Sequence, residues 1–255
     1  MSKAIILKSP EEIRLMAKAN AIVADTLAML GRKVAVGIST WQLDKWAEEF
    51  ARAQGGEPAF KGYRGFPGSL CVSLNHEVVH GIPSRQVFLR EGDIVSIDFG
   101  VKYRDYYGDA ATSLAVGIIA AEKKRLLQVT EESLYKGIEK ATVGNRISDI
   151  SLAVQTHVES NGFSIVRQFV GHGIGKQLHE APEIPNYYRR ESSPRLLAGM
   201  VLAIEPMVNM GGHEVRVLRD GWTVVTKDSK PSAHFEHSVA VTEEGPLILS
   251  RRTEV

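Results

Sequence analysis

Two aspartates lie in neighbouring apolar segments that have the pattern of a β-hairpin. Asp98 interrupts one apolar run, and Asp109 follows the polar stretch that ends it. We expect the turn to be centred on Tyr103 and Arg104, a register that places Asp98 directly opposite Asp109, with Cβ atoms about 5 Å apart. Two carboxylates that close in a buried hairpin repel each other unless one is protonated or a cation lies between them. The pair therefore predicts a metal site, against the plainer alternative that one aspartate faces solvent.

An internal repeat selects a third carboxylate. At an offset of 107 residues, the segment 92–98 matches the segment 199–205, so that Asp98 corresponds to Glu205. The same offset relates Val36-Gly37 to Val143-Gly144 and Gly55 to Gly162. Glu236 is a fourth acid that enters a strand-like run. Four carboxylates balance the charge of two divalent cations, and oxygen ligands suit such ions.

Histidines supply the other candidate groups. Gly171 and Gly173 flank His172, and glycines let the backbone come close to a ligand, so His172 is the candidate imidazole ligand. His80 and His179 lie in loop-like contexts, where they could donate hydrogen bonds or carry protons to a substrate. The alternative for each is an ordinary loop histidine.

The segment His76-Glu77-Val78-Val79-His80 matches the H-E-x-x-H signature of zinc peptidases. That signature needs a helix, which brings both histidines to one face. Here the two valines and the following Gly81-Ile82-Pro83 favour a strand and a loop. In an extended strand, His76 and His80 would lie about 13 Å apart, too far to share one zinc ion. We therefore exclude a zinc site of this type.

The elements that must position these residues follow from periodicity. Ser9-Pro10-Glu11-Glu12 has the pattern of a helix N-terminus, and apolar residues recur at helical spacing as far as Gly31. A second helix is expected from near Ser39 or Thr40 to Gly55-Gly56. Further helical patterns cover about 122–140 and 148–160.

Strand-like segments follow each pair of helices. They fill 60–116 and return from 163 onward, so the order helix, helix, strands occurs twice. We expect one compact catalytic domain over 1–255, with pseudo-repeat halves at about 10–120 and 121–250 and a site between them.

Composition places the chain among globular proteins. Its 255 residues are 44% hydrophobic and 24% charged, which is ordinary for a folded domain. The formal net charge of +1 argues against binding nucleic acid through bulk charge. Cys71 is the single cysteine, which excludes an internal disulfide and a zinc finger. No apolar stretch approaches about 18 residues and the start lacks a secretory pattern, so we expect a soluble, cytoplasmic protein.

The candidate ligands, in the order Asp98, Asp109, His172, Glu205 and Glu236, resemble the five-ligand set of the methionine aminopeptidases. Longer strings that carry the resemblance lie at 62–67, 75–83, 96–100, 171–175 and 179–186. The resemblance covers the chain from Ser9 to about Thr242. It is strongest to the short type I form, without the inserted helical subdomain of type II.

The resemblance implies the α+β pita-bread fold, a curved antiparallel sheet with outer helices, internal pseudo-two-fold symmetry and a dinuclear metal site inside. It implies that Asp98 chelates one cation, that Asp109 and Glu236 bridge both, and that His172 and Glu205 bind the other. The cofactors would be two divalent metal ions, Co, Mn, Fe(II) or Zn. A water between them would be the nucleophile, with its pKa lowered by both charges.

The same resemblance assigns catalytic and substrate-binding residues. Glu205 would move protons, His179 would stabilise the tetrahedral intermediate, and His80 would contact the scissile amide. The pocket for a methionine side chain would be lined by Phe60, Tyr63, Phe66, Cys71, Leu178, Met207 and Trp222. Aromatic and sulfur contacts suit a flexible thioether.

By this resemblance the protein is a metallo-aminopeptidase that removes the N-terminal methionine from nascent proteins and peptides when the second residue is small. Its partners would be nascent polypeptide N-termini close to the ribosome, with no membrane or nucleic-acid partner, and it would act as a monomer. Two alternatives are open. A proline-specific peptidase of the same fold usually carries an extra N-terminal domain. A non-catalytic relative that binds protein or RNA should have lost ligands, whereas all five are present here.

Overall fold

The computed structural model describes residues 4–251, so both ends of the expected 1–255 domain lie outside the described residues. The helices are α1 (Pro10–Lys33), α2 (Thr40–Ala53), α3 (Ala121–Ile138) and α4 (Ile147–Ser160), with a short 3-10 turn, η1, at Tyr63–Gly65. None of the described helices is both long and apolar enough to span a bilayer.

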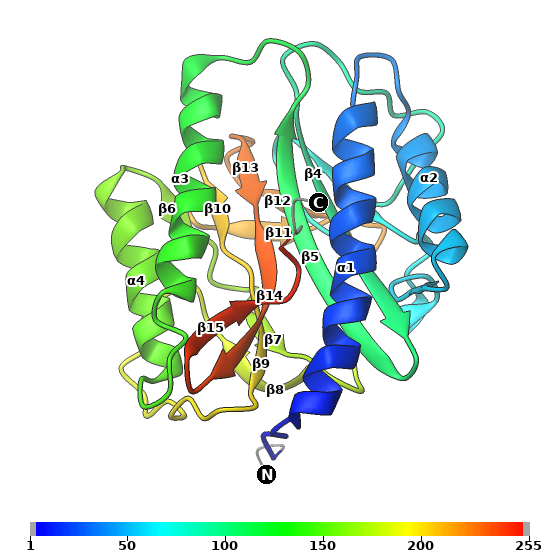
Figure 1. The fold of residues 1–255 in the computed structure, drawn as a ribbon. Coiled ribbons are helices and arrows are strands. Elements are labelled where there is room, and N and C mark those ends of the chain that lie inside the picture. The colour runs from blue at the N-terminus through cyan, green and yellow to red at the C-terminus, as the bar shows by residue number, and fades with distance from the viewer. Residues whose placement is uncertain (1–3, 252–255) are drawn as a thin grey trace.

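The strands form one large antiparallel sheet and two small ones. They are β1 (Glu57–Pro58), β2 (Cys71–Leu74), β3 (Glu77–Val79), β4 (Ile94–Tyr103), β5 (Tyr106–Ala115), β6 (Ser164–Ile165), β7 (Gly171–Gly173), β8 (Glu180–Ile184), β9 (Val201–Ile204), β10 (Met207–Asn209), β11 (Val215–Val217), β12 (Val224–Thr226), β13 (Ser232–His234), β14 (Glu236–Thr242) and β15 (Gly245–Ile248). The large sheet runs in the order β1-β4-β5-β14-β9-β7-β8, with β2 paired to β4 and β15 to β14. Figure 1 shows α1 and α2 on one side of the molecule and α3 and α4 on the other, with β4, β5 and β14 between them.

The first helix begins as its sequence predicts. The Ser9 side chain accepts a hydrogen bond from the backbone of Glu12, and the Glu12 side chain accepts one from the backbone of Ser9. This capping box satisfies two amide groups that have no partner inside the helix. Gly31, expected to close the helix, lies in its last turn, and Val34 caps it.

Alternation along β4 separates the helix-facing core from the opposite face of the sheet. Ile97, Phe99 and Val101 are fully buried in one apolar cluster with residues of α1 and α2, such as Leu30 and Leu43. Successive side chains of a strand point to opposite faces, so the residues between them face away from the helices. Burying one such large side chain contributes about 1.5–3 kcal/mol, which keeps β4 in this orientation.

The register of the β4–β5 hairpin differs from the expected one by two residues. Asp98 pairs with Ala111, and Asp109 pairs with Gly100, because the turn is centred on Arg104 and Asp105. Both turn residues have left-handed φ, at 47° and 56°. A two-residue turn that matches strand twist needs this conformation at both positions, and aspartate adopts it more readily than tyrosine. The expected opposition of Asp98 and Asp109 was therefore wrong, although both still share one face.

The offset of 107 residues recurs in the backbone. The bounds of α4 are those of α2 moved by this offset. An isolated bridge between Ser39 and Phe88 recurs between Arg146 and Arg195 at the same offset. The N-termini of α2 and α4 are therefore attached to the following loops in the same way, as expected for two related halves.

Candidate metal centre

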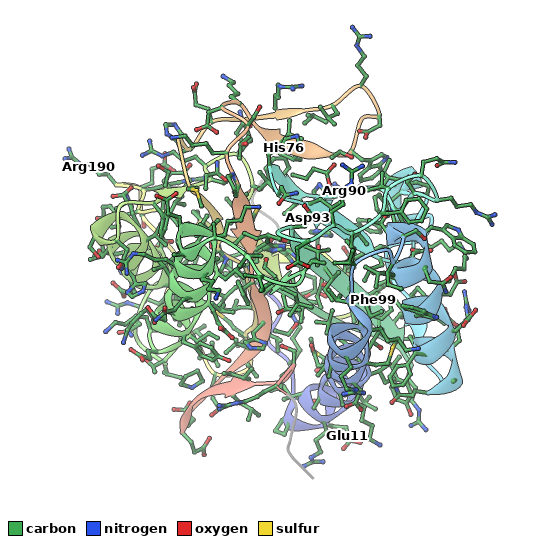
Figure 2. All side chains as sticks on the ribbon, turned by 90° about the horizontal axis from the view of Figure 1, so that it is seen from above. Glu11, His76, Arg90, Asp93, Phe99 and Arg190 are labelled. Atoms are coloured by element: carbon green, nitrogen blue, oxygen red, sulfur yellow. The ribbon has the colours of Figure 1, made fainter. Side chains whose placement is uncertain are left out.

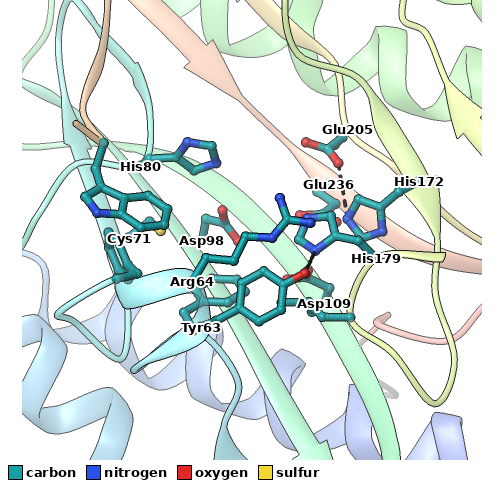
Figure 3. Close-up of a pocket in the computed structure, with 14 residues that line it drawn as sticks. Tyr63, Arg64, Cys71, His80, Asp98, Asp109, His172, His179, Glu205 and Glu236 are labelled. Carbon is teal, nitrogen blue, oxygen red and sulfur yellow. Dashed lines mark hydrogen bonds and ion pairs between the residues drawn. The ribbon is translucent and has the colours of Figure 1, made fainter. Parts of the chain in front are cut away.

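Five ligand-type side chains come from five consecutive strands of the large sheet. Asp98 lies on β4, Asp109 on β5, Glu236 begins β14, Glu205 directly follows β9, and His172 lies on β7. These strands are neighbours in that order. Figure 3 shows the five side chains converging on one cavity. The order of ligands across the sheet thus differs from their order in the chain.

The strand register explains why three carboxylates share a face. Asp98 and Glu236 are both paired with Ala111, one from each side of β5. Paired residues of neighbouring strands point to the same face, and so does Asp109, two residues from Ala111. Cys71 is paired with Asp98 from β2, which brings the cysteine to the same cavity.

The cavity encloses about 650 Å³, open solvent at its mouth included. Its lining residues are Phe60, Tyr63, Arg64, Phe66, Cys71, His80, Asp98, Asp109, His172, Leu178, His179, Glu205, Trp222 and Glu236. The structure thus brings together every site residue that the sequence suggested except Met207. Met207 is fully buried in an apolar cluster with Val79 and Val224. Its expected place in the substrate pocket stays a prediction.

The ligand atoms are arranged as a cation needs them. Asp109, His172 and Glu236 each offer a ligand atom, and these atoms all lie within 4.8 Å of one another. His172 Nδ1 lies 3.0 Å from the carbonyl of Gly173, which can only accept, so Nδ1 carries the proton and Nε2 is free to ligate. Its Nε2 lies 3.6 Å from Glu205 Oε1. Two acceptor atoms at this distance fit a shared cation.

Burial and mutual repulsion perturb the carboxylates. Burial raises the pKa of Asp98 to about 7, and His234 opposes this increase while Glu205 adds to it. Burial raises the pKa of Glu205 to about 7 as well, and His172 opposes that shift. Burial, followed by neighbouring carboxylates, raises the pKa of Asp109 and Glu236 well above the ordinary range.

Buried polar atoms without a hydrogen-bond partner give a second test of whether the residues suit a metal ion. Within residues 4–251, the buried side-chain atoms without a hydrogen-bond partner are Asp98 Oδ1, Asp109 Oδ1, Asn186 Oδ1, His234 Nε2 and Glu236 Oε1. Buried acceptors are normally satisfied, and three of these belong to the proposed ligands. Repelling carboxylates with unpaired oxygens are the electrostatic pattern of a cation site. The residues present therefore fit divalent metal ions.

The first helix holds Asp109 in place. Asn20, a polar residue on the apolar face of α1, accepts a hydrogen bond from the Asp109 backbone N–H at 3.3 Å. The Ser238 hydroxyl accepts from the same N–H and donates to the Asp109 carbonyl at 2.8 Å. Gly108 permits this approach, since a Cβ there would lie 2.7 Å from the Asn20 backbone nitrogen.

The second helix anchors the loop that carries Tyr63. Glu48 lies 2.9 Å from Lys61 Nζ and accepts a hydrogen bond from the Ser69 hydroxyl at 3.0 Å. Asp44 accepts hydrogen bonds from the backbone amides of Ser69, at 2.6 Å, and Leu70, at 3.0 Å. Both ends of the loop are thereby tied to α2.

Two neutral histidines face the cavity. Burial, with a contribution from His234, lowers the pKa of His80 to about 4. Partial desolvation at the cavity, with contributions from His172 and then Arg64, lowers the pKa of His179, although its side chain is still exposed to solvent. Both imidazoles are therefore uncharged near neutral pH, able to donate one hydrogen bond and accept another.

Sequence reasoning missed two residues of the site. Arg64 is the only arginine or lysine among the described residues that line the cavity. His234 is buried, and its Nε2 lies 3.7 Å from Glu205 Oε2. His234 stands two residues before Glu236, so strand alternation was the available signal. Arg64 lies in the segment 62–67, but nothing in that segment indicated that its side chain lines the cavity.

The H-E-x-x-H segment is not a helix. Glu77–Val79 forms β3. A turn at Asn75 and His76 precedes it, and Asn75 and His80 both have left-handed φ. His76, labelled in Figure 2, is exposed. His80, in contrast, lines the cavity. The expected strand and loop are confirmed, and the segment lacks the helix that the signature needs.

Comparison with known proteins agrees with this geometry. The profile of metallopeptidase family M24 matches residues 14–243. The methionine aminopeptidase of Clostridium perfringens is 55% identical over 246 residues, 96% of this chain and 98% of that protein. The chain belongs to metallopeptidase family M24. It is an enzyme, a metallopeptidase hydrolase, and the resemblance read from the sequence is confirmed.

Solved structures show which M24 enzymes share the fold of this chain. The crystal structure of methionine aminopeptidase from Thermotoga maritima matches with a TM-score of 0.96 at 44% identity, over 98% of this chain and 100% of that one. The prolidase from Pyrococcus furiosus matches with a TM-score of 0.80 at 22% identity, and this chain covers 66% of it. The second likeness shows a shared fold alone. The pita-bread architecture expected for this M24 enzyme is thus confirmed.

Proposed function

We propose that this enzyme removes the N-terminal methionine from polypeptides whose second residue is small, with two divalent cations as cofactors. The observation that supports the proposal is the convergence of one ligand-type side chain from each of five neighbouring strands on a single cavity. The remaining walls of that cavity are mainly aromatic and sulfur-bearing, which suits a thioether.

Asp109 and Glu236 would bridge the two cations, Asp98 would hold one, and His172 with Glu205 would hold the other. Carboxylates with one imidazole suit Co, Mn, Fe(II) or Zn. Two such cations supply Lewis-acid polarisation of the scissile carbonyl and acidification of a water nucleophile. The ligand carboxylates would keep their charges in the loaded site, because the cations would offset the burial and the repulsion that raise their pKa values.

The other residues would bind the substrate and move protons. Glu205 would accept a proton from the attacking water and return it to the leaving amine. His179 would donate to the oxygen that becomes negative, and His80 to the scissile amide. The methionine side chain would lie against Phe66 and Trp222, whose rings meet edge to face at 5.2 Å. Phe60, Cys71 and Leu178 complete the lining beside them.

The proposal treats the chain as one catalytic domain. The first half contributes Asp98 and Asp109, the second contributes His172, Glu205 and Glu236, and neither half holds the set alone. Because a single chain supplies all five, the proposed active form is a monomer. Its partners would be the amino termini of nascent chains in the cytoplasm, close to the ribosome, with no nucleic-acid partner.

Peptide hydrolysis tests the proposal directly. The protein is incubated with Met-Ala-Ser or an Ala-Pro peptide in the presence of Mn(II) or Co(II), with EDTA as the control. We expect release of methionine from Met-Ala-Ser, loss of that activity with EDTA, and little cleavage of Ala-Pro. Faster cleavage of the Ala-Pro peptide would favour a proline-specific peptidase, and no cleavage of either would favour a binding protein of this fold.

A further inference from the structure

Tyr63 and His179 meet at the cavity, although 116 residues separate them in the chain. The Tyr63 hydroxyl oxygen lies 2.9 Å from His179 Nδ1. The two rings also stack, with centroids 5.3 Å apart and planes inclined by 17°. We infer that Tyr63 is a positioning residue whose hydroxyl donates to Nδ1 and holds His179 in the tautomer with its proton on Nε2. The inference deepens the proposed function and rests on His179 acting there as a donor.

The direction of this hydrogen bond follows from acidity. A phenol O–H, with a pKa of about 10, is a stronger acid than the N–H of a neutral imidazole. An imidazole nitrogen is in turn a stronger base than a phenol oxygen. The phenol of Tyr63 therefore donates, and His179 Nδ1 accepts. Once Nδ1 is an acceptor, the single proton of the neutral ring lies on Nε2.

For catalysis, this hydrogen bond would keep His179 Nε2 protonated, and therefore able to donate, before the substrate reacts. Developing negative charge needs an N–H that faces it before the reaction begins. The other tautomer would present a lone pair from Nε2 and would repel the same charge. Tyr63 would thus act through His179, in addition to forming part of the methionine pocket as the sequence suggested.

Packing holds the ring in this orientation. Figure 3 shows His179 between Tyr63 and His172. The centroid of His179 lies 4.2 Å from that of His172, with the planes inclined by 40°. Ring contacts with both neighbours restrict rotation of the imidazole. The loop that carries Tyr63 is in turn tied to α2 through Glu48 and Lys61, so the hydroxyl is presented from a fixed segment.

The tautomer is measured by nitrogen NMR on the full-length protein loaded with diamagnetic Zn²⁺ and labelled with ¹⁵N at histidine. Loss of signals in His179→Ala assigns the resonances. We expect an unprotonated Nδ1 and a protonated Nε2 in the parent protein. We expect a mixture of tautomers in Tyr63→Phe, which keeps the ring but removes the hydroxyl. A protonated Nδ1 in the parent, or an unchanged tautomer in Tyr63→Phe, would overturn the inference.

Kinetics gives a second, independent readout. A hydrogen bond of ordinary net strength corresponds to about a twofold to tenfold bias in tautomer ratio. Tyr63→Phe should therefore lower kcat for Met-Ala-Ser in proportion to the share of His179 that leaves the Nε2–H tautomer, about twofold for an equal mixture, and leave KM unchanged. In the His179→Ala background the same change should have no further effect, since Tyr63 acts through that ring. Tyr103→Phe, which removes a hydroxyl outside the cavity, is the matched control and should match the parent.

The outcomes separate the inference from the function on which it rests. A higher KM with unchanged kcat in Tyr63→Phe would make Tyr63 a pocket wall alone. An equal loss of kcat in the parent and His179→Ala backgrounds would show that Tyr63 does not act through His179. If methionine peptides are not cleaved at all, the proposed function fails, while the NMR result still decides the tautomer.

Discussion

Asp98 and Asp109 are diagonal neighbours on the cavity face of the β4–β5 hairpin. Asp98 pairs with Ala111, whereas Asp109 pairs with Gly100. Diagonal positions lie about 7–8 Å apart, compared with about 5 Å for directly opposed residues. The wider spacing leaves room for cations between the carboxylates. Glu236 reaches the same space because it pairs with Ala111 from the other side.

Removing one charge from a proposed bridging ligand should reduce activity severely. Asp109→Asn or Glu236→Gln leaves the shape of the site but removes one of the carboxylates proposed to hold both cations. We expect a loss of at least about 100-fold in kcat/KM, above the usual cost of losing a residue that only orients a ligand. Metal content after dialysis, measured with turnover of Met-Ala-Ser, checks this. His76→Ala, outside the cavity, should retain activity, and normal turnover in the bridging variants would refute the assignment.

His179→Ala should lower kcat far more than it raises KM. The imidazole would donate to charge that exists only in the transition state, so substrate binding depends on it little. Losing one such donor typically costs about 10²–10³ in kcat. Steady-state kinetics with Met-Ala-Ser measures both parameters. An unchanged kcat would reduce His179 to a wall of the cavity.

Gly108→Ala should destabilise the protein and disturb the metal site together. A Cβ at this position would lie 2.7 Å from the backbone nitrogen of Asn20 and 2.8 Å from the carbonyl carbon of Ala19. The helix α1 must move away from β5, at a cost of about 1–3 kcal/mol. Because Asn20 accepts from the Asp109 amide, metal affinity should fall as well. Denaturant unfolding and metal titration test this, with Gly212→Ala, where the nearest atom is 4.0 Å away, as the control.

Glu48 should make folding sensitive to acid. Burial raises the pKa of its carboxyl, but hydrogen bonds from Lys61 and Ser69 outweigh that effect and bring the pKa to about 2. A carboxyl whose pKa is lower in the folded state stabilises it fully above about pH 4.5, and this stabilisation is lost as the pH falls towards about 2.

Glu48→Gln measures that contribution. The variant should be less stable than the parent at pH 7 by about 1–2 kcal/mol, a value reduced because the Lys61 side chain is exposed to solvent. The difference should shrink below about pH 4. Urea unfolding at several pH values gives both curves. A constant difference across this range would show that the charge of Glu48 is not responsible.

The size of the second substrate residue should control the rate. A bulky side chain beside the proposed cations would displace the scissile carbonyl, and a misplacement of about 1 Å can cost about 10²-fold in rate. In the series Met-X-Ser, we expect Gly, Ala and Ser at X to be cleaved rapidly and Leu and Lys slowly. Comparable kcat/KM for Ala and Lys would contradict a narrow site, even in a working aminopeptidase.

The sequence by itself determined the features that depend on near neighbours in the chain. Ser9 and Glu12 form the predicted capping box, and Ser39 caps the second helix, because caps need only a few residues. The candidate ligands also followed from the sequence, since Asp98 and Glu205 are acids within or directly after apolar segments at a repeat offset. That pattern has few explanations other than a cation.

Only the tertiary structure decided the contacts between distant segments. Moving the hairpin register by two residues keeps every side chain on its face, so alternation could not distinguish the two positions of Asp98 relative to Asp109. The sequence alone also did not show that Met207 packs in one apolar cluster with Val79 and Val224, which come from distant segments of the chain. The hydrogen bond between Tyr63 and His179 joins loops from the two halves of the chain. Such a contact exists only after the sheet has brought both halves to one cavity.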